Sequence, residues 1–154
     1  MQLLLIRHAI AEDGAEDDAR ALTEKGRKRF EEVVRGLDAL DLRLDLVLHS
    51  PKLRAVQTAE LLAPLVDGEV QVTGLLAEAP GQALLKHLRG DAVAVVGHQP
   101  WLGELLGLLL TGETRHGAAF ELKKGAVARL EGECAPGAMR LMALLQPGAL
   151  RKVR

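Results

Sequence analysis

The sequence predicts a three-layer α/β fold, in which a mostly parallel, doubly wound sheet is flanked by helices and has an antiparallel portion at its C-terminal edge. Short apolar runs at residues 3–6, 46–48 and 93–96 each stop at a polar or charged group. Runs of this length are typical of strands buried on both faces. Helical patterns lie between the runs, and this alternation indicates βαβ crossovers.

Four patterns predict the helices. Apolar residues recur at helical spacing from 30 to 40, and Thr23 can cap the N-terminus of this first helix. The second helix is expected over residues 53–62, the third around 84–88 and the fourth over 101–109. Each of these helices can cover one face of the sheet with its apolar side.

The remaining strands are expected near residues 70–72 and in the C-terminal part of the chain. After Thr111 the pattern changes, and the segments 118–122, 126–130 and 139–145 are strand-like with turns between them. Strands joined by short turns pair antiparallel. These segments therefore predict the antiparallel edge of the sheet.

Length, charge and hydropathy limit the class of protein. The 154 residues suit one domain over residues 1–154. Twenty Lys and Arg residues against 21 Asp and Glu residues give a net charge of −1, and the charges are scattered, which disfavours nucleic acid as a partner. The runs 3–6 and 105–110 are too short or interrupted for a signal peptide or membrane span, so we expect a cytoplasmic protein with no membrane association.

Polar groups gather where the predicted parallel strands end. Arg7 and His8 follow the first strand, His49 and Ser50 the second, and His98 the third. Ligands of an open α/β sheet bind outside the carboxyl ends of its strands, so these side chains are expected in one crevice. A single histidine at a strand end would be interpreted as a cap for backbone groups. Three histidines beside an arginine indicate a functional site.

Two helices are expected to begin at this crevice. Ser50 suits the N-cap and Pro51 the first position of the helix that carries Arg54, and Pro100 opens another helix behind His98. Helix N-termini favour anions, and arginine presents a fork of donors to phosphate oxygens. The sequence therefore predicts a pocket for a phosphoryl group, which should also bind phosphate or sulfate-like anions.

Other chemistries fit the same residues less well. Two arginines would repel a metal dication, and no closely spaced His/Cys motif is present, so neither a metal nor a cofactor is expected. Ser50 does not lie in a G-x-S-x-G elbow, which disfavours a serine nucleophile. The G-x-x-x-x-G-K-[ST] loop of nucleotide hydrolases does not occur.

Three segments resemble the motifs of the histidine phosphatase superfamily, in order and with suitable spacing: Leu4–Ala9, Ser50–Ala59 and Val96–Pro100. The chain length and the segments 7–12 and 22–26 are similar to the short, SixA-type phosphohistidine phosphatases. The resemblance covers residues 3 to about 110 and implies an α/β phosphatase.

The resemblance also implies roles for particular residues. His8 would be the nucleophile that is phosphorylated, and Arg7, Arg54 and His98 would form the phosphate pocket. Ala9 departs from the Arg-His-Gly spelling that is most common in the family, and His49 stands where small hydroxyl residues are common. The segment Arg115-His116-Gly117 spells the motif literally but follows a helix and a turn, so it is expected to lie outside the site.

The residue types predict a mechanism in which neutral His8 attacks phosphorus in line and water then hydrolyses phospho-His8. Glu78 is the candidate proton donor, and a loop-surface carboxylate is the equally open alternative. The acidic segment after His8, residues 12–18, is interpreted as a solvated turn, although it could meet a basic partner surface.

The short chain leaves little room for a lid over small phosphates. An open pocket favours phosphohistidine on a partner protein as the substrate, by resemblance. The alternatives are a small phosphomonoester as the substrate, or a non-catalytic phosphate-binding module. A binding module would need only the arginines, so the presence of both His8 and His98 favours an enzyme.

Overall fold

A six-stranded sheet forms the centre of the computed structural model, which describes residues 1–14 and 16–153. Its strand order is β3-β2-β4-β1-β5-β6. The neighbours among β1 to β4 pair in parallel, whereas β5 pairs antiparallel with β1 and with β6. The strands are β1 (Gln2–Arg7), β2 (Leu44–His49), β3 (Val66–Val72), β4 (Ala92–Gly97), β5 (Val127–Gly132) and β6 (Met139–Leu145).

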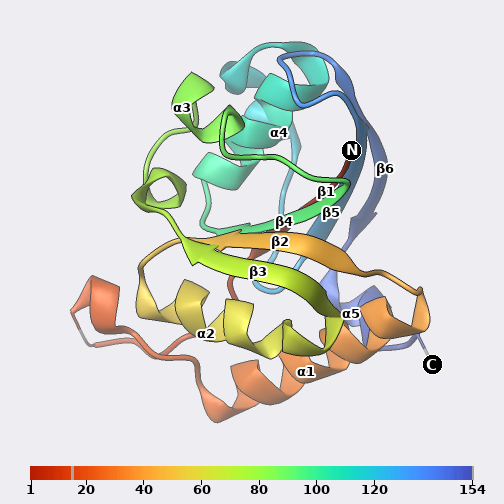
Figure 1. Cartoon of the computed structure of the whole chain (residues 1–154). Helices are drawn as coiled ribbons and strands as arrows, with labels where there is room; N and C mark the ends of the chain where they lie inside the picture. The colour runs from red at the N-terminus through yellow and green to blue at the C-terminus, as the bar shows by residue number, and fades with distance from the viewer. Residues whose placement is uncertain (15, 154) are drawn as a thin grey trace.

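Helices cover both faces of the sheet, which confirms the predicted three-layer α/β fold (Figure 1). One face carries α1 (Glu24–Ala39), α2 (Leu53–Leu61) and α5 (Pro147–Leu150), and the other carries α3 (Gln82–Leu85) and α4 (Trp101–Thr111). The connections contain the short 3-10 helices η1 (Asp17–Ala19), η2 (Ala63–Leu65), η3 (Gly74–Ala77) and η4 (Thr114–Ala119). Within the described residues, no helix has the length and apolar character needed to cross a membrane.

The apolar run of β1 fills two separate cores. Leu4 and Ile6 pack into the core under α1 and α2, whereas Leu3 and Leu5 pack into the core under α4. Alternate residues of a strand point to opposite faces, so both sets are buried at once. Burying each such side chain stabilises the fold by about 1.5–3 kcal/mol. The continuous run is therefore what a central strand with helices on both faces requires.

The helix ends follow the predictions in one case and differ in another. Thr23 caps α1, since its Oγ1 accepts a hydrogen bond of 2.8 Å from the N–H of Gly26. Helix α2 begins at Leu53 with Lys52 as its N-cap, so the prediction that Ser50 is the N-cap and Pro51 the first helical residue was wrong by two positions. Ser50 still accepts a hydrogen bond of 3.2 Å from the N–H of Lys52.

The prediction of a strand over residues 118–122 was wrong. Residues 114–119 form η4, and residues 120–123 have no regular secondary structure. Gly117 lies so close to α4 that a Cβ there would be 2.5 Å from the backbone of Gly103. The segment therefore packs against α4 through facing glycines instead of joining the sheet. The antiparallel edge consists of β5 and β6 alone.

Candidate active site

The strand register brings two histidines together. Arg7 at the end of β1 pairs with Gly97 at the end of β4, so the next residues, His8 and His98, leave the sheet side by side. Their ring centroids are 5.2 Å apart. Both side chains are buried, with 5% and 4% of their surface exposed. The sheet edge thus assembles the pair that the sequence predicted.

The neighbouring strand adds the next group. His49 of β2 pairs with Val96, and the N–H of Ser50 donates to the carbonyl of Val96 at 3.1 Å. This places the Ser50 hydroxyl 2.7 Å from Nε2 of His98. The sequence predicted Ser50 at this crevice but assigned its hydroxyl to helix capping and not to a contact with His98. The contact depends on the alignment of β2 with β4, for which the chain carries no local signal.

His8 is held in a neutral, oriented form. Its Nδ1 lies 2.7 Å from the carbonyl oxygen of Ala9, and because a carbonyl can only accept, Nδ1 carries the proton and Nε2 keeps a free lone pair. Burial lowers the pKa of His8 from 6.5 to about 3, against the Ala9 hydrogen bond, which raises it. The neighbouring His98 ring and the charges of Arg54 and Arg7 contribute to the same lowering of the His8 pKa.

His98 is also neutral near pH 7. Burial lowers its pKa from 6.5 to about 4, and the charges of Arg54 and Lys52 act in the same direction, against Asp17, which raises it. The Ser50 oxygen already accepts from the N–H of Lys52, which leaves the Ser50 hydrogen available to Nε2 of His98. That arrangement favours the tautomer with the proton on Nδ1 of His98.

Arg54 is buried at the start of α2 and makes contacts that sequence analysis missed. One of its terminal nitrogens donates 2.7 Å to the carbonyl oxygen of Asp17, and the other lies 3.3 Å from the Asp17 carboxylate. Lys52 donates to the same carboxylate. The hydrogen bond from Lys52, with the charge of Arg54, lowers the pKa of Asp17 to about 2. The acidic segment is thus tied to the site at Asp17.

A buried threonine connects α2 to the backbone after His8. The Oγ1 of Thr58 accepts a hydrogen bond of 3.0 Å from the N–H of Ala9 and donates 2.7 Å to the carbonyl of Arg54. Thr58 is a fully buried residue of α2 that packs beneath the site. Its two hydrogen bonds position His8 and Arg54 relative to each other.

Three donor-capable atoms in this crevice have no partner within the described residues. They are buried side-chain nitrogens: Nε of Arg7, Nε of Arg54 and Nδ1 of His98. Buried polar groups are normally satisfied, and an unsatisfied one costs about 1–3 kcal/mol. Three such atoms around a neutral histidine can be satisfied by one anion with several acceptor oxygens.

Three further residues singled out in the sequence, Glu78, His49 and His116, differ in their surroundings. Glu78 is exposed, but it lines a small cavity together with His98 and Trp101, whose ring centroids are 6.2 Å apart. His49 is partly buried, and its Nδ1 contacts the carbonyl of Ser50. His116 lies in η4 and contacts Thr111, outside the crevice as predicted.

Among the residues that the structure describes, the crevice does not have the side chains of a metal site. Across residues 1–14 and 16–153, there is no group of three or more His, Cys, Asp or Glu side chains that could hold a metal ion. The cations Arg7, Arg54 and Lys52 surround the histidine pair instead. The crevice has the donor set of an anion site.

Known proteins resemble the chain over most of its length. The family profile "Histidine phosphatase superfamily (branch 1)" matches residues 3–83, which include His8 and Arg54. An uncharacterised protein of Picosynechococcus sp. is 40% identical over 93% of this chain and 90% of its own. Phosphohistidine phosphatase SixA of Escherichia coli is 32% identical over 74% of this chain and 77% of its own.

The fold is similar to a solved structure as well. The protein histidine phosphatase SixA complexed with tungstate superposes with a TM-score of 0.80 at 27% sequence identity. The match covers 97% of this chain and 99% of that chain. It therefore extends beyond the profile match to the segments that carry His98 and the antiparallel edge.

Proposed function

Because the chain belongs to the histidine phosphatase superfamily, branch 1, and is a phosphatase by that membership, we propose that it acts through a phosphohistidine intermediate on His8. Its substrate in this proposal is phosphohistidine on a partner protein. The reaction requires no metal ion or cofactor. One observation carries the proposal: the ring of neutral His8 lies 5.2 Å, centroid to centroid, from that of His98, beside three buried nitrogens that have no partner in the part of the chain that the structure describes.

In the first step, Nε2 of His8 attacks phosphorus with its lone pair. The N–P bond forms while the bond from phosphorus to the leaving group breaks, and the leaving group takes that electron pair. Arg7, Arg54 and Nδ1–H of His98 hold the three outer oxygens, where negative charge spreads in the transition state. The carbonyl of Ala9 stabilises the positive charge that develops on the imidazole of His8.

In the second step, water attacks phospho-His8. The P–N bond breaks, its electron pair returns to Nε2, and inorganic phosphate leaves with the oxygen of the water and with its protons on phosphate oxygens. The same donors hold the oxygens in both steps. His8 is therefore regenerated as a neutral imidazole, ready for another turnover.

The leaving group distinguishes the two candidate substrate classes. Imidazole leaves from phosphohistidine with little help, whereas an alkoxide needs a proton. Glu78 lines a small cavity beside His98, which favours a small phosphomonoester as the second candidate. The name of the relative SixA supports phosphohistidine as the first.

The intermediate can be trapped directly. The protein is mixed with a ³²P-labelled phosphohistidine peptide, quenched in base during turnover, and separated from the peptide by size. We expect acid-labile, base-stable label on the protein, located at His8 by mass spectrometry, and none in His8→Ala. EDTA should leave turnover unchanged. Unlabelled wild-type protein that still releases phosphate, or activity lost in EDTA and restored by zinc, would refute the proposal.

A further inference from the structure

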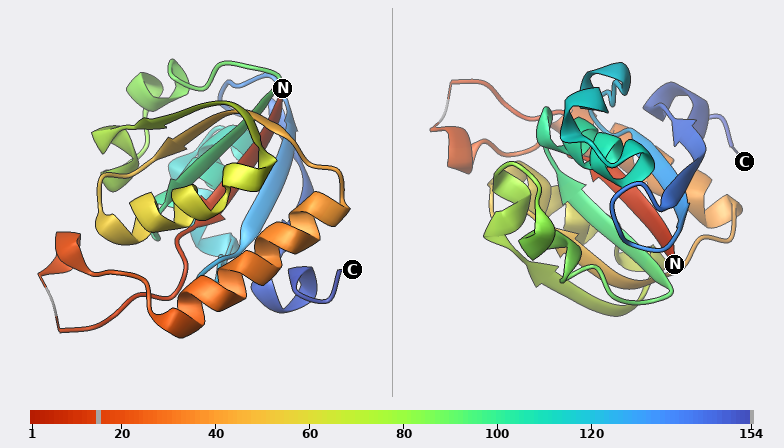
Figure 2. Two further views of the ribbon diagram at one scale, coloured as in Figure 1. Left: turned by 60° about the horizontal axis from the view of Figure 1, so that its bottom comes forward. Right: turned by 90° about the horizontal axis from the view of Figure 1, so that it is seen from above.

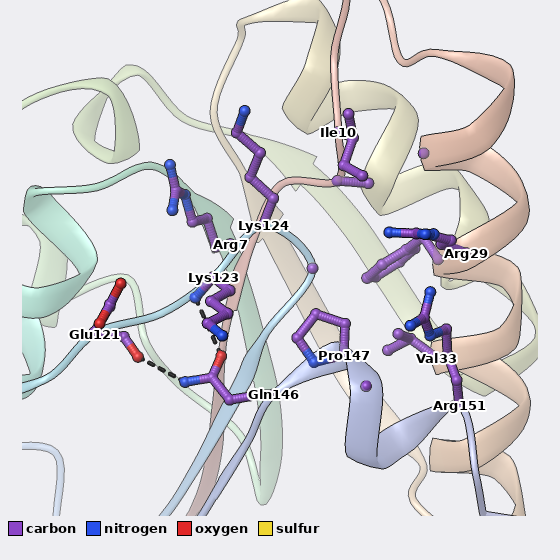
Figure 3. Close-up of a pocket in the computed structure, with 15 residues that line it drawn as sticks. Arg7, Ile10, Arg29, Val33, Glu121, Lys123, Lys124, Gln146, Pro147 and Arg151 are labelled. Carbon is purple, nitrogen blue, oxygen red and sulfur yellow. Dashed lines mark hydrogen bonds between the residues drawn. The ribbon is translucent and has the colours of Figure 1, made fainter.

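A cleft of about 660 Å³ opens beside the catalytic site and is not used by the proposed reaction (Figure 3). Its walls come from the loop after β1, from α1, from the loop before β5 and from α5. Arg7 and Ala9, the neighbours of His8 in the chain, both line it. The cleft therefore adjoins the site at which the phosphoryl group is expected, through the residues on either side of His8.

Positive charge is concentrated in this cleft. Its lining contains one carboxylate, that of Glu121, and five basic side chains: Arg7, Arg29, Lys123, Lys124 and Arg151. Arg29, Lys123 and Lys124 form no salt bridge with any residue that the structure describes. The whole chain carries a net charge of −1, so this cluster is a local departure from its average. Such a cluster attracts an anionic ligand.

The base of the cleft is apolar. Phe30 and Val33 of α1 are almost fully buried beneath it, and Ile10 and Pro147 add apolar surface to its walls (Figure 3). An apolar base with a basic rim suits a ligand that combines carboxylates with aliphatic side chains. An inorganic anion would leave that base uncovered.

The other flank of the site has the opposite charge. The exposed acidic segment after β1 is held to α2 by the contacts of Asp17 with Lys52 and Arg54. Figure 2 shows residues 11–14 and 16–20 extending at one side of the molecule, away from α5. A ligand large enough to meet both flanks would be oriented by them. This polarity favours a protein surface over a small polyanion.

We propose that the cleft binds an acidic, partly apolar segment of the protein that carries the phosphohistidine. The inference rests on the proposed function and adds the partner's chemistry to it. The acidic segment of this chain would face a basic part of the same partner. Arg29 and Lys124 would raise the rate of productive encounter and lower KM, without taking part in the chemical step.

The test compares two charge-reversal variants. The first, Arg29→Glu with Lys124→Glu, alters the cleft. The second, Lys28→Glu with Lys86→Glu, makes the same change in net charge at exposed positions outside the cleft. Each is assayed with two phosphohistidine peptides, one flanked by Glu and Leu and one by Gln and Leu, and with phenyl phosphate. Binding of the unphosphorylated acidic peptide is followed by NMR.

For the cleft variant, we expect kcat/KM for the acidic peptide to fall ~10-fold or more at low salt, with the loss shrinking as salt is added. The neutral peptide, phenyl phosphate and the control variant should change less than twofold. In wild type, the unphosphorylated acidic peptide should shift backbone resonances of residues 26–33, 121–125 and 146–151.

Three results would overturn the proposal: equal losses for both peptides, equal losses in the control variant, or no peptide-induced shifts in the cleft. Binding of tripolyphosphate there without peptide binding would assign the cleft to a small polyanion and overturn it too. Failure of the proposed function is seen separately, as wild-type protein that turns over phenyl phosphate but neither phosphohistidine peptide.

Discussion

The hydroxyl of Ser50 lies 2.7 Å from Nε2 of His98, so a residue at the end of β2 determines which nitrogen of His98 faces the catalytic crevice. Nδ1 of His98 is then left without a partner within the described residues. With its proton on that nitrogen, His98 can donate to a phosphate oxygen while remaining uncharged. We therefore predict that Ser50 is a positioning residue that acts through His98.

Ser50→Ala should therefore lower kcat/KM by about 5–10-fold, since a hydrogen bond of this kind contributes on the order of 1 kcal/mol. In a His98→Ala background the same substitution should cost less than twofold, because there is no imidazole left to orient. Steady-state kinetics of the four proteins give the answer. Thr23→Ala is the matched control, since it removes a helix-capping hydroxyl that bonds Gly26 and Ile10 instead of His98, and it should reduce mainly stability. Independent, multiplicative losses would contradict the positioning role.

The two buried histidines should also leave a signature in pH dependence. Their pKa values of about 3 and about 4 lie below the ~6.5 of an unfolded histidine, so between pH 6.5 and 4 the unfolded chain takes up protons that the native protein does not. Stability should fall as pH falls through this window, by up to about 1.4 kcal/mol per pH unit for each histidine. Denaturant unfolding of wild type and of the double variant His8→Ala with His98→Ala measures the difference in slope.

NMR provides a direct check of the same pH prediction. The ring Cε1–H resonances of His8 and His98 should keep neutral-imidazole chemical shifts from pH 7 to 5. A histidine in an unstructured reference peptide titrates with a pKa of about 6.5. Resonances of His8 that titrate together with the peptide would contradict the buried, neutral nucleophile.

Variants of Arg54 and His116 test whether position in the crevice or a literal match to the Arg-His-Gly motif identifies an active-site residue. Arg54→Ala should lower kcat by about 10²–10³-fold, the loss typical of removing one donor to a transition-state oxygen. His116→Ala should leave kcat/KM nearly unchanged, since His116 contacts Thr111 and Glu113 in and beside η4. Circular dichroism confirms that both variants fold. Comparable kinetic losses would mean that the crevice is not the active site.

Glu78 should matter for one class of leaving group only. If it protonates a departing alkoxide, Glu78→Gln should slow an alkyl phosphomonoester by about 10²–10⁴-fold while phosphohistidine hydrolysis changes little. Parallel assays of both substrates with the purified variant test this. Glu60→Gln, a change on the exposed side of α2, is the control. An equal effect of Glu78→Gln on both substrates would exclude proton donation to the leaving group.

Much of the fold, and the residues that gather in the candidate site, could be predicted from the sequence because their signals are local. The apolar run before His8 and the one before His98 mark buried parallel strands, and such strands end at a common edge. The basic residue Arg54 lies in the first turn of the helix that follows the second predicted strand. These patterns require no knowledge of which strands are neighbours.

Tertiary structure alone decided the features that depend on contacts between distant segments. The pairing of Arg7 with Gly97 sets the spacing of the two histidines, and the alignment of β2 with β4 brings Ser50 to His98. Asp17 meets Arg54 across 37 positions of the chain. Residues 118–122 look like a strand in isolation, yet the close approach of Gly117 to α4 keeps them out of the sheet. Local patterns predict elements, whereas register and close packing are properties of pairs of elements, so they are settled only when the whole chain is folded.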